Sequence, residues 1–323
     1  MVASRALSAP LKQLIRRTWR ALGLPTGQDL AVRLAKAWAT LSWPATVLFL
    51  LYNPRQHPAY GLTWRRKLQL ARRMWKTTRG ITTGTSYKAH LAMASKLLEI
   101  PPEVKGAVVE CGCWYGGSTA NLSLICDVVG RDLIVYDSFE GLPPPEAGDL
   151  YAKDEATGLL KAELDLVRDN VRRFGVVERC TFRKGWFSAT LPHHEEPIVL
   201  AFLDVDWQAS LDDCITNLWP HLTDTGYVFI DEFVLSDYCA LFWSERYWKT
   251  RFGTTPPGLI GSGSGVGTGG YYLGPFDEWN WIQDPTSVAY TRKDFSGHWN
   301  YYPEDSALRE ASAGVGQGSQ RGS

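Results

Sequence analysis

Hydrophobic runs alternate with segments of helical spacing along the middle of the chain. Five runs rich in Val, Ile, Leu and Phe predict buried strands, over residues 107–113, 132–139, 180–185, 198–206 and 226–233. Apolar positions at helical spacing predict helices between them, over 118–129, 158–174 and 210–222. Because the strands are apolar throughout, both faces of their sheet must be covered. The pattern therefore predicts a doubly wound, Rossmann-like α/β fold with a parallel sheet.

The flanking segments extend this domain in both directions. Residues 87–99 and 237–252 have helical spacing, 287–295 predict a last strand, and 256–270 form a Gly/Ser-rich stretch typical of a loop. The 323 residues therefore divide into three predicted parts. These are a basic helical N-terminal extension over 1–79, one domain over 80–300 and a disordered tail over 311–323.

The N-terminal extension is strongly basic, although the whole chain has a net charge of zero. Residues 1–79 contain 15 Lys and Arg but a single acid, Asp29, so their charge of +14 balances −14 in the remainder. Tryptophans are interleaved with these bases, and Trp settles at the headgroup level of membranes. We therefore expect 1–79 to contact an anionic membrane surface rather than nucleic acid. Packing on the acidic body and a homo-oligomer contact are the alternatives.

Two further features bear on where the protein resides. Residues 37–54 are uncharged but include Pro44 and Asn53, and a membrane span needs about 20 apolar residues. An interfacial element or a packed helix is therefore favoured there over a transmembrane helix. The six cysteines show no CxxC spacing, which predicts buried reduced thiols. With no secretory signal, these features predict a cytoplasmic protein, peripheral at the inner face of the membrane.

A glycine-rich turn, Glu110 to Thr119, follows the first predicted strand and opens its helix. Gly112, Gly116 and Gly117 allow the backbone to turn sharply and approach a ligand. A dinucleotide fingerprint has a glycine where this chain has Trp114, at the point where the backbone meets a pyrophosphate. S-Adenosylmethionine has no pyrophosphate, so the turn favours that cofactor over NAD. A turn that only packs strand on helix is the alternative.

An acid, Asp137, ends the second predicted strand. A carboxylate at this place can accept hydrogen bonds from both ribose hydroxyls of an adenosyl ligand. A helix cap or a turn would also use such an acid. The loop that follows, 140–158, contains several acids and three consecutive prolines, which predicts an exposed lid over the site.

Two pairs of acids follow the fourth and fifth predicted strands: Asp204 with Asp206, and Asp231 with Glu232. A single helical crossover joins these strands, so both pairs lie at the edge where open α/β sheets bind ligands. Crowded carboxylates repel one another at neutral pH unless a cation neutralises them. Oxygen ligands without His or Cys suit Mg²⁺, or Mn²⁺ as a substitute. Solvated strand-end acids are the alternative, which fits Asp206 best.

In their order and spacing these motifs resemble the macrocin O-methyltransferase family of S-adenosylmethionine- and Mg²⁺-dependent sugar O-methyltransferases. The resemblance rests on VVECGCWYGGST, VYDSFEGLPPP, KGWFSATLP, FLDVDWQAS and GYVFIDEF, within residues 80–250. It implies a class I methyltransferase fold, Mg²⁺ held by Asp204, Asp231 and Glu232, and Asp204 as the general base. It also implies cofactor contacts from Glu110, Gly112, Gly116, Ser118, Asp137, Ser138, Gly185, Trp186 and Phe187.

The chain departs from the family pattern in three places. Asp231-Glu232 replaces two adjacent aspartates, and Trp207-Gln208-Ala209-Ser210 stands in place of Tyr-Glu-Ser-Thr. We therefore expect the metal geometry and the substrate contacts of this chain to differ from those of the family. The basic residues 1–79 and the Gly/Ser loop have no counterpart in the family pattern.

Methyl transfer to a hydroxyl accounts for these residues chemically. A hydroxyl is a poor nucleophile until it is deprotonated, and a bound divalent ion lowers its pKa. The expected acceptor is a hydroxyl of a sugar or glycosylated natural product, with a lipid-linked or surface glycan favoured by the basic extension. A nicotinamide-dependent oxidoreductase and a non-catalytic membrane scaffold on the same fold are the other function classes. His90, His193, His194 and His221 are the alternative bases.

Overall fold

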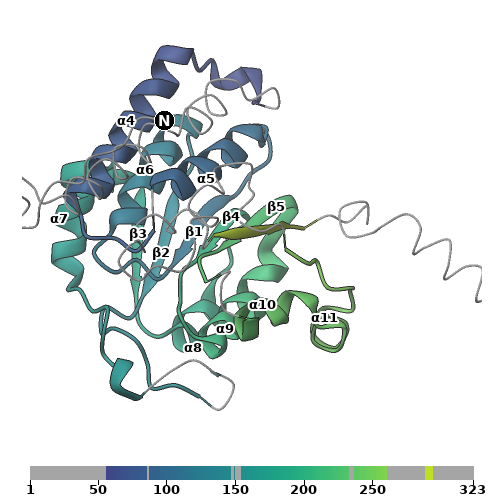
Figure 1. The fold of residues 1–323 in the computed structure, drawn as a ribbon. Helices are drawn as coiled ribbons and strands as arrows, with labels where there is room; N and C mark the ends of the chain where they lie inside the picture. The colour runs from purple at the N-terminus through teal and green to yellow at the C-terminus, as the bar shows by residue number, and fades with distance from the viewer. Residues whose placement is uncertain are drawn as a thin grey trace, which may run out of the picture. The chain divides into compact units, whose positions relative to one another are not determined.

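The sheet predicted from the apolar runs is present (Figure 1). The computed structural model describes residues 56–85, 87–146, 149, 154–232, 236–259 and 288–293, all within one compact unit of the chain, residues 46–323. The strands are β1 (Ala107–Cys111), β2 (Leu133–Asp137), β3 (Cys180–Lys184), β4 (Ile198–Leu203), β5 (Leu222–Ile230) and β6 (Ala289–Arg292). They lie in the order β3-β2-β1-β4-β5-β6.

The order in which the chain adds strands to the sheet reverses between β1 and β4. Strands β1 to β5 pair in parallel, whereas β6 runs antiparallel to β5. From β1 the chain steps outward to β2 and β3, then returns to β4 on the other side of β1 and continues to β5. Open α/β sheets bind ligands at the carboxyl ends of their strands beside such a switch point. The fold therefore places the site between the ends of β1 and β4.

Helices cover both faces of the sheet (Figure 1). One layer contains α4 (Trp64–Gly80), α5 (Tyr87–Glu99), α6 (Gly117–Val129) and α7 (Leu164–Phe174). The other contains α8 (Phe187–Thr190), α9 (Gln208–Leu218), α10 (Ser236–Ala240) and α11 (Glu245–Phe252). Short 3-10 turns are η1 (Pro58–Tyr60), η2 (Asp154–Ala156), η3 (Val177–Arg179), η4 (Leu191–His193), η5 (Trp219–His221) and η6 (Leu241–Trp243).

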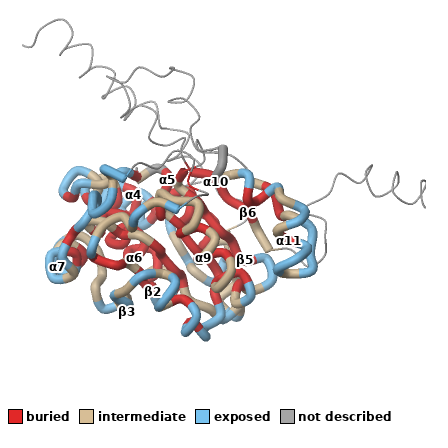
Figure 2. Tube along the Cα trace, turned by 90° about the horizontal axis from the view of Figure 1, so that it is seen from below, coloured by how far each residue is buried: buried red, intermediate tan, exposed pale blue. Residues whose placement is uncertain are grey.

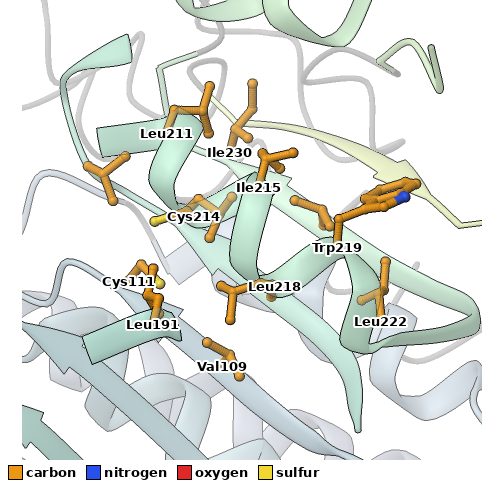
Figure 3. Close-up of a cluster of buried hydrophobic side chains, with 14 of the residues drawn as sticks. Val109, Cys111, Leu191, Leu211, Cys214, Ile215, Leu218, Trp219, Leu222 and Ile230 are labelled. Atoms are coloured by element: carbon orange, nitrogen blue, oxygen red, sulfur yellow. The ribbon is translucent and has the colours of Figure 1, made fainter. Parts of the chain in front are cut away.

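The central strands carry the core (Figure 2). All six residues of β4 are buried, and the edge strand β3 has no fully buried residue. On one face, Leu211, Cys214, Ile215 and Leu218 of α9 lie in one cluster with Val109 of β1 (Figure 3). This burial on both faces explains why the strands are apolar throughout. It also fixes the positions of the polar residues that follow each strand.

Helix α4 belongs to the same packed unit, although it lies on the N-terminal side of the domain boundary predicted at residues 79 and 80. Its side chains Leu70 and Met74 are buried, and the Asn121 amide of α6 donates to the Met74 carbonyl at 3.3 Å. Its last residue, Gly80, is so close to the Phe174 ring of α7 that an added Cβ would lie 2.3 Å from it. Residues 64–79 are therefore tied to α6 and α7, while the domain division itself stays a prediction.

Several predicted elements differ in extent from those observed. The helix predicted over 158–174 begins only at Leu164, and the one predicted over 237–252 is broken into α10, η6 and α11. The second break lies at Ser244, whose hydroxyl accepts from the Tyr247 N–H and caps a new helix. Helix α8 was not predicted, because one turn is too short to show a helical period. None of the six cysteines, all of them among the described residues, forms a disulfide; four are buried, as predicted, and two are half-buried.

The predictions for the two ends of the chain lie outside the described residues. These are the first 55 residues of the basic extension, which include the uncharged segment 37–54, and the tail 311–323. Most of the Gly/Ser-rich loop, from residue 260 onward, lies outside them as well. Among the helices that are described, none has the length and apolar character needed to cross a membrane.

Candidate active site

A cavity of about 300 Å³ opens at the carboxyl ends of the strands, at the switch point. The β1–β2 half contributes Gly112, Cys113, Trp114, Asp137 and Ser138, and the β4–β5 half contributes Asp204, Val205, Asp206, Trp207 and Asp231. Trp186 and Phe187, which follow β3, complete its aromatic lining. The cavity therefore collects the glycine turn, the strand-end acids and three tryptophans in one place.

The glycine turn brings the ends of β1 and β4 unusually close together. Gly112 has φ +82°, a left-handed conformation that favours glycine, and a Cβ there would lie 1.8 Å from the Asp204 carbonyl oxygen. The Asp204 N–H donates to the Cys111 carbonyl at 3.0 Å beside it. Trp114 also has a positive φ, 43°, and lines the cavity at the position where a dinucleotide site has glycine. The turn therefore links the predicted cofactor half directly to the predicted metal half.

Asp137 is held rigidly at the end of β2. One carboxylate oxygen accepts from the Cys113 N–H at 2.7 Å, and the other accepts from the Phe139 N–H at 2.7 Å. Ionised carboxylates have about four acceptor positions, so two remain for a ligand in the cavity. The neighbouring Ser138 hydroxyl bonds to the Gly141 carbonyl and accepts from the Glu140 N–H. This geometry fits an acid that receives a pair of hydroxyl groups.

Glu110 is fully buried in β1 and does not line the cavity. Burial raises its pKa to about 8, and the hydroxyls of Ser118 and Thr119 only partly oppose this rise. Neither carboxylate oxygen has a hydrogen-bond partner of normal geometry among the described residues. Glu110 is therefore protonated and neutral at pH 7. Its predicted cofactor contact, like those of Gly116, Ser118 and Gly185, is not supported by a position in the cavity lining.

Three carboxylates cluster at the ends of β4 and β5. Ligand atoms of Asp204, Asp206 and Glu232 all lie within 4.8 Å of one another. Asp206 has φ +60°, uncommon for a residue other than glycine, and its N–H donates to the Glu232 carboxylate at 3.0 Å. The second Glu232 oxygen is buried without a hydrogen-bond partner among the described residues. Asp206, which fitted the solvated alternative best in the sequence, is thus an integral part of this cluster.

Asp231 lies beside the cluster and lines the cavity. Its carboxylate and that of Asp204 share the hydroxyl of Thr85, at 3.3 Å and 3.1 Å respectively. Asp231 is not within the 4.8 Å group, so its predicted role as a metal ligand stays a prediction. Thr85 comes from the segment before α5, and no sequence signal pointed to it.

The electrostatics of the cluster fit a divalent cation. Burial, followed by the charges of Asp231 and Glu232, raises the pKa of Asp204 well above its usual range. Burial also raises the pKa of Asp206 to about 6 and, together with Asp231 and Asp206, that of Glu232. Such carboxylates are costly to ionise unless a positive charge lies among them. A set made only of carboxylate oxygens suits Mg²⁺ or Mn²⁺ rather than Zn²⁺.

The described residues of the loop after β2 are hydrogen-bonded over the cavity. At its neck, the Leu142 N–H donates to the Leu159 carbonyl at 2.9 Å. The Trp207 indole N–H donates to the Pro143 carbonyl at 3.0 Å. Asp149 is buried, and its carboxylate accepts from the N–H groups of Glu146 and Ala209 at 2.7 and 3.0 Å. Asp149 thereby caps the first turn of α9, whose own N-cap residue makes no side-chain cap.

The structure also shows where the candidate bases lie relative to the cavity. Asp204 lines the cavity, whereas none of the histidines among the described residues does. Burial lowers the pKa of His90 to about 3, and its ring contacts the Asn121 amide within the α5–α6 layer. His194 is buried against the Tyr136 hydroxyl at 2.9 Å and the Glu196 carbonyl at 2.8 Å. Asp204 is therefore the better candidate for a base that faces a ligand.

A six-stranded sheet in this order, with an antiparallel sixth strand and a cavity at the switch point, defines a class I methyltransferase fold. The chain belongs to the family described as Macrocin-O-methyltransferase (TylF), whose sequence model matches residues 83–256. The solved structure titled "Structure of the O-methyltransferase NovP" has the same fold, with a TM-score of 0.51 and 21% identity. That likeness covers 79% of this chain and 99% of the other.

Two curated relatives share about a third of their aligned residues with this chain. The 8-demethyl-8-(2,3-dimethoxy-alpha-L-rhamnosyl)-tetracenomycin-C 4'-O-methyltransferase of Streptomyces olivaceus is 34% identical over 174 residues, 50% of this chain. The demethyldecarbamoylnovobiocin O-methyltransferase of Streptomyces niveus is 33% identical over 172 residues, 47% of this chain. The chain matches 65% of the length of each relative.

Proposed function

We propose that this chain is an S-adenosylmethionine- and Mg²⁺-dependent O-methyltransferase that acts on a hydroxyl of a sugar or glycosylated natural product. The observation that carries the proposal is one cavity shared by two half-sites. The rigid turn with Asp137 suits an adenosyl ligand, and the Asp204–Asp206–Glu232 cluster suits a divalent cation. Membership of the macrocin family supports the same reading.

Each half would supply one part of the reaction. S-Adenosylmethionine provides an electrophilic methyl group, and Mg²⁺ provides a positive charge that lowers the pKa of a nearby hydroxyl. Asp137 binds the ribose hydroxyls, and the turn around Gly112 leaves room for the rest of the cofactor. Asp204 accepts the proton of the acceptor hydroxyl. The common cavity places both groups for attack, which contributes much of the rate in such transfers.

The charge of the cavity limits the class of acceptor. Among the described residues, its lining contains seven carboxylates and no Lys, Arg or His. Those acids are Asp137, Glu146, Asp149, Asp204, Asp206, Asp213 and Asp231. One Mg²⁺ and one cofactor neutralise only part of this charge, so a sugar phosphate would be repelled. Uncharged or cationic sugars fit, and tryptophans such as Trp207 offer flat apolar surface for a sugar ring.

The names of the relatives suggest what kind of molecule carries such a sugar. One relative is named for methylating a rhamnosyl tetracenomycin, and another for methylating demethyldecarbamoylnovobiocin. We infer an acceptor sugar that is already attached to its aglycone, and we retain a lipid-linked glycan as the second source. We expect no nucleic acid substrate.

The enzyme assignment is tested with purified protein, S-adenosylmethionine and a panel of neutral glycosides, amino glycosides and sugar phosphates. Methylated products detected by mass spectrometry should depend on Mg²⁺ or Mn²⁺ and vanish with EDTA. Calorimetry of S-adenosylmethionine binding, run in parallel, separates an enzyme from a scaffold. Cofactor binding without turnover of any acceptor, with or without metal, would favour the non-catalytic scaffold.

We further propose that the basic N-terminal residues place the enzyme at the cytoplasmic face of an anionic membrane. Helix α4 supports this, because Trp64 and Leu68, one turn apart, are 59% and 43% exposed beside Arg65 and Arg66. Full-length protein should sediment with anionic liposomes and dissociate in high salt. Replacing Trp64 and Leu68 by serine should weaken this binding without changing cofactor affinity. Equal binding would instead favour an oligomer contact, which light scattering would detect.

A further inference from the structure

A short segment between α4 and α5 touches both halves of the cavity. We call residues 81–85 the strap. Thr83 packs on the N-terminus of α6 so closely that a Cβ added to Gly117 would lie 2.8 Å from the Thr83 Cβ. Gly84 lines the cavity, and Thr85 reaches the acids of β4 and β5. The strap thus connects the cofactor turn to the metal cluster, although it lies before the first strand of the sheet.

The hydroxyl of Thr85 is held in place from two sides. The residue is 1% exposed, and its hydroxyl lies 3.1 Å from the Asp204 carboxylate and 3.3 Å from that of Asp231. Its backbone is fixed by Thr83, whose hydroxyl accepts from the Thr85 N–H at 3.3 Å and bonds to the Thr85 carbonyl at 3.2 Å. The hydrogen bonds of Thr85 to Thr83 and to the two acids are all at least partly buried.

The chemistry of the three side chains assigns the direction of these bonds. When a bound cation holds both acids in the ionised form, each carboxylate only accepts hydrogen bonds, so the single hydroxyl proton of Thr85 lies between them. Without that proton, the like charges of Asp204 and Asp231 would drive the two carboxylates apart. Thr85 therefore opposes their separation. An acid held in one orientation also loses less conformational freedom when it binds a cation.

We propose that Thr85 is a positioning residue for the metal site, because its hydroxyl holds Asp204 and Asp231 in the arrangement that accepts the cation. This inference rests on the proposed Mg²⁺ site. The role predicts a selective effect: loss of the hydroxyl weakens metal affinity and leaves the cofactor half unchanged, since Asp137 and its two donors lie on β2 and the turns beside it.

The test compares Thr85→Val, which removes the hydroxyl at nearly constant volume, with Thr85→Ser, which retains it. The matched control is Thr82→Val, an exposed threonine in the same strap. Titration calorimetry measures Mg²⁺ and Mn²⁺ affinity, and separately S-adenosylmethionine affinity, for the full chain. We expect Thr85→Val to bind metal at least about tenfold more weakly, as for a lost hydrogen bond to a charged group. Thr85→Ser and Thr82→Val should stay within threefold of wild type.

Each outcome bears on a different claim. Wild-type affinity for metal in a folded Thr85→Val variant would overturn the role of Thr85 while leaving the metal site standing. An equal loss of metal and cofactor affinity would show a structural role only. A wild-type protein that binds neither Mg²⁺ nor Mn²⁺ would overturn the metal site itself. Thr85→Ala provides the same comparison if the valine variant does not fold.

Discussion

The carboxylates in the two halves of the cavity have opposite electrostatic surroundings. In the β1–β2 half, Asp137 is alone and receives two backbone N–H groups at 2.7 Å. In the β4–β5 half, four acids lie together, and burial with mutual repulsion raises the pKa of Asp204, Asp206 and Glu232. The first half is complete in electrostatic terms before any ligand arrives. The second is stable in ionised form only once positive charge is added.

This difference indicates a division of labour. A carboxylate that accepts two backbone N–H hydrogen bonds suits recognition, because its orientation is fixed before the ligand binds. Carboxylates that repel one another store an unfavourable interaction, which cation binding relieves. We infer that the cofactor half recognises the adenosyl ligand, whereas the acid half becomes competent only when a cation is bound.

The most damaging test removes the glycine that joins the two halves. Gly112→Ala should destabilise the fold by more than about 3 kcal/mol or prevent folding, because its Cβ would overlap the Asp204 carbonyl oxygen at 1.8 Å. Chemical denaturation measures the change. The control is Gly130→Ala, which has a similar φ of +70° but no heavy atom within 4 Å of the added Cβ. That variant should lose only about 1–2 kcal/mol. Similar losses in both would show that the close approach at Gly112 is not real.

Two variants test whether the cofactor half and the acid half bind their ligands independently. Asp204→Asn should abolish turnover and weaken Mg²⁺ binding by about 10–100-fold while retaining S-adenosylmethionine affinity. Asp137→Asn should do the reverse, with cofactor affinity reduced about 10–100-fold and Mg²⁺ affinity retained. Calorimetry with each ligand measures both. If either variant lost both ligands equally in a folded protein, the two halves would not be independent sites.

The last prediction concerns Glu110, the buried acid of β1 that does not line the cavity. The pKa of Glu110 is about 8 in the folded protein, against 4.5 when exposed. Between these values the unfolded chain has released a proton that the folded protein retains, so stability falls as the pH rises. From pH 5 to pH 7 this amounts to roughly 2–3 kcal/mol.

Glu110→Gln should remove that dependence, since the amide resembles the protonated acid in shape and does not ionise. Thermal unfolding of cofactor-free protein at pH 5, 6 and 7 measures the difference from wild type. The variant should gain stability relative to wild type as the pH rises. A constant difference across this range would mean that Glu110 is ionised in the folded protein.

Much of the fold could be predicted from sequence because burial imposes a pattern that is readable locally. Five strands were identified from apolar runs and the last from residues 287–295, and the helix over 87–99 has the bounds expected from its spacing. Errors arose where the deciding interaction is short or distant. Serine at 244 restarts a helix through a single cap, and Leu164 begins one only after an irregular segment. Neither event changes the hydrophobic period.

The site could be predicted where strand ends bring residues together, and not where loops do. Asp137, Asp204 and Asp231 were identified because the carboxyl ends of parallel strands meet at one edge. Thr85 is 119 residues from Asp204 in the chain, and no periodicity links the two. Asp206 was undervalued because its role depends on a positive φ that a sequence does not display. The roles of Thr85 and Asp206 depend on tertiary contacts and backbone conformation, which local sequence patterns do not show.

The cap that Asp149 places on α9 has a consequence for protein engineering. Grafting loops between relatives is a natural way to alter which acceptor a methyltransferase takes. In this chain the loop also completes the first turn of a helix whose residues Leu211, Cys214 and Ile215 are part of the core. A transplanted loop without an acid at that position would remove the acceptor of the Ala209 N–H in the first turn of α9. Acceptor preference and the stability of α9 would then change together. A useful chimera should therefore keep Asp149 and its hydrogen bonds to the N–H groups of Glu146 and Ala209.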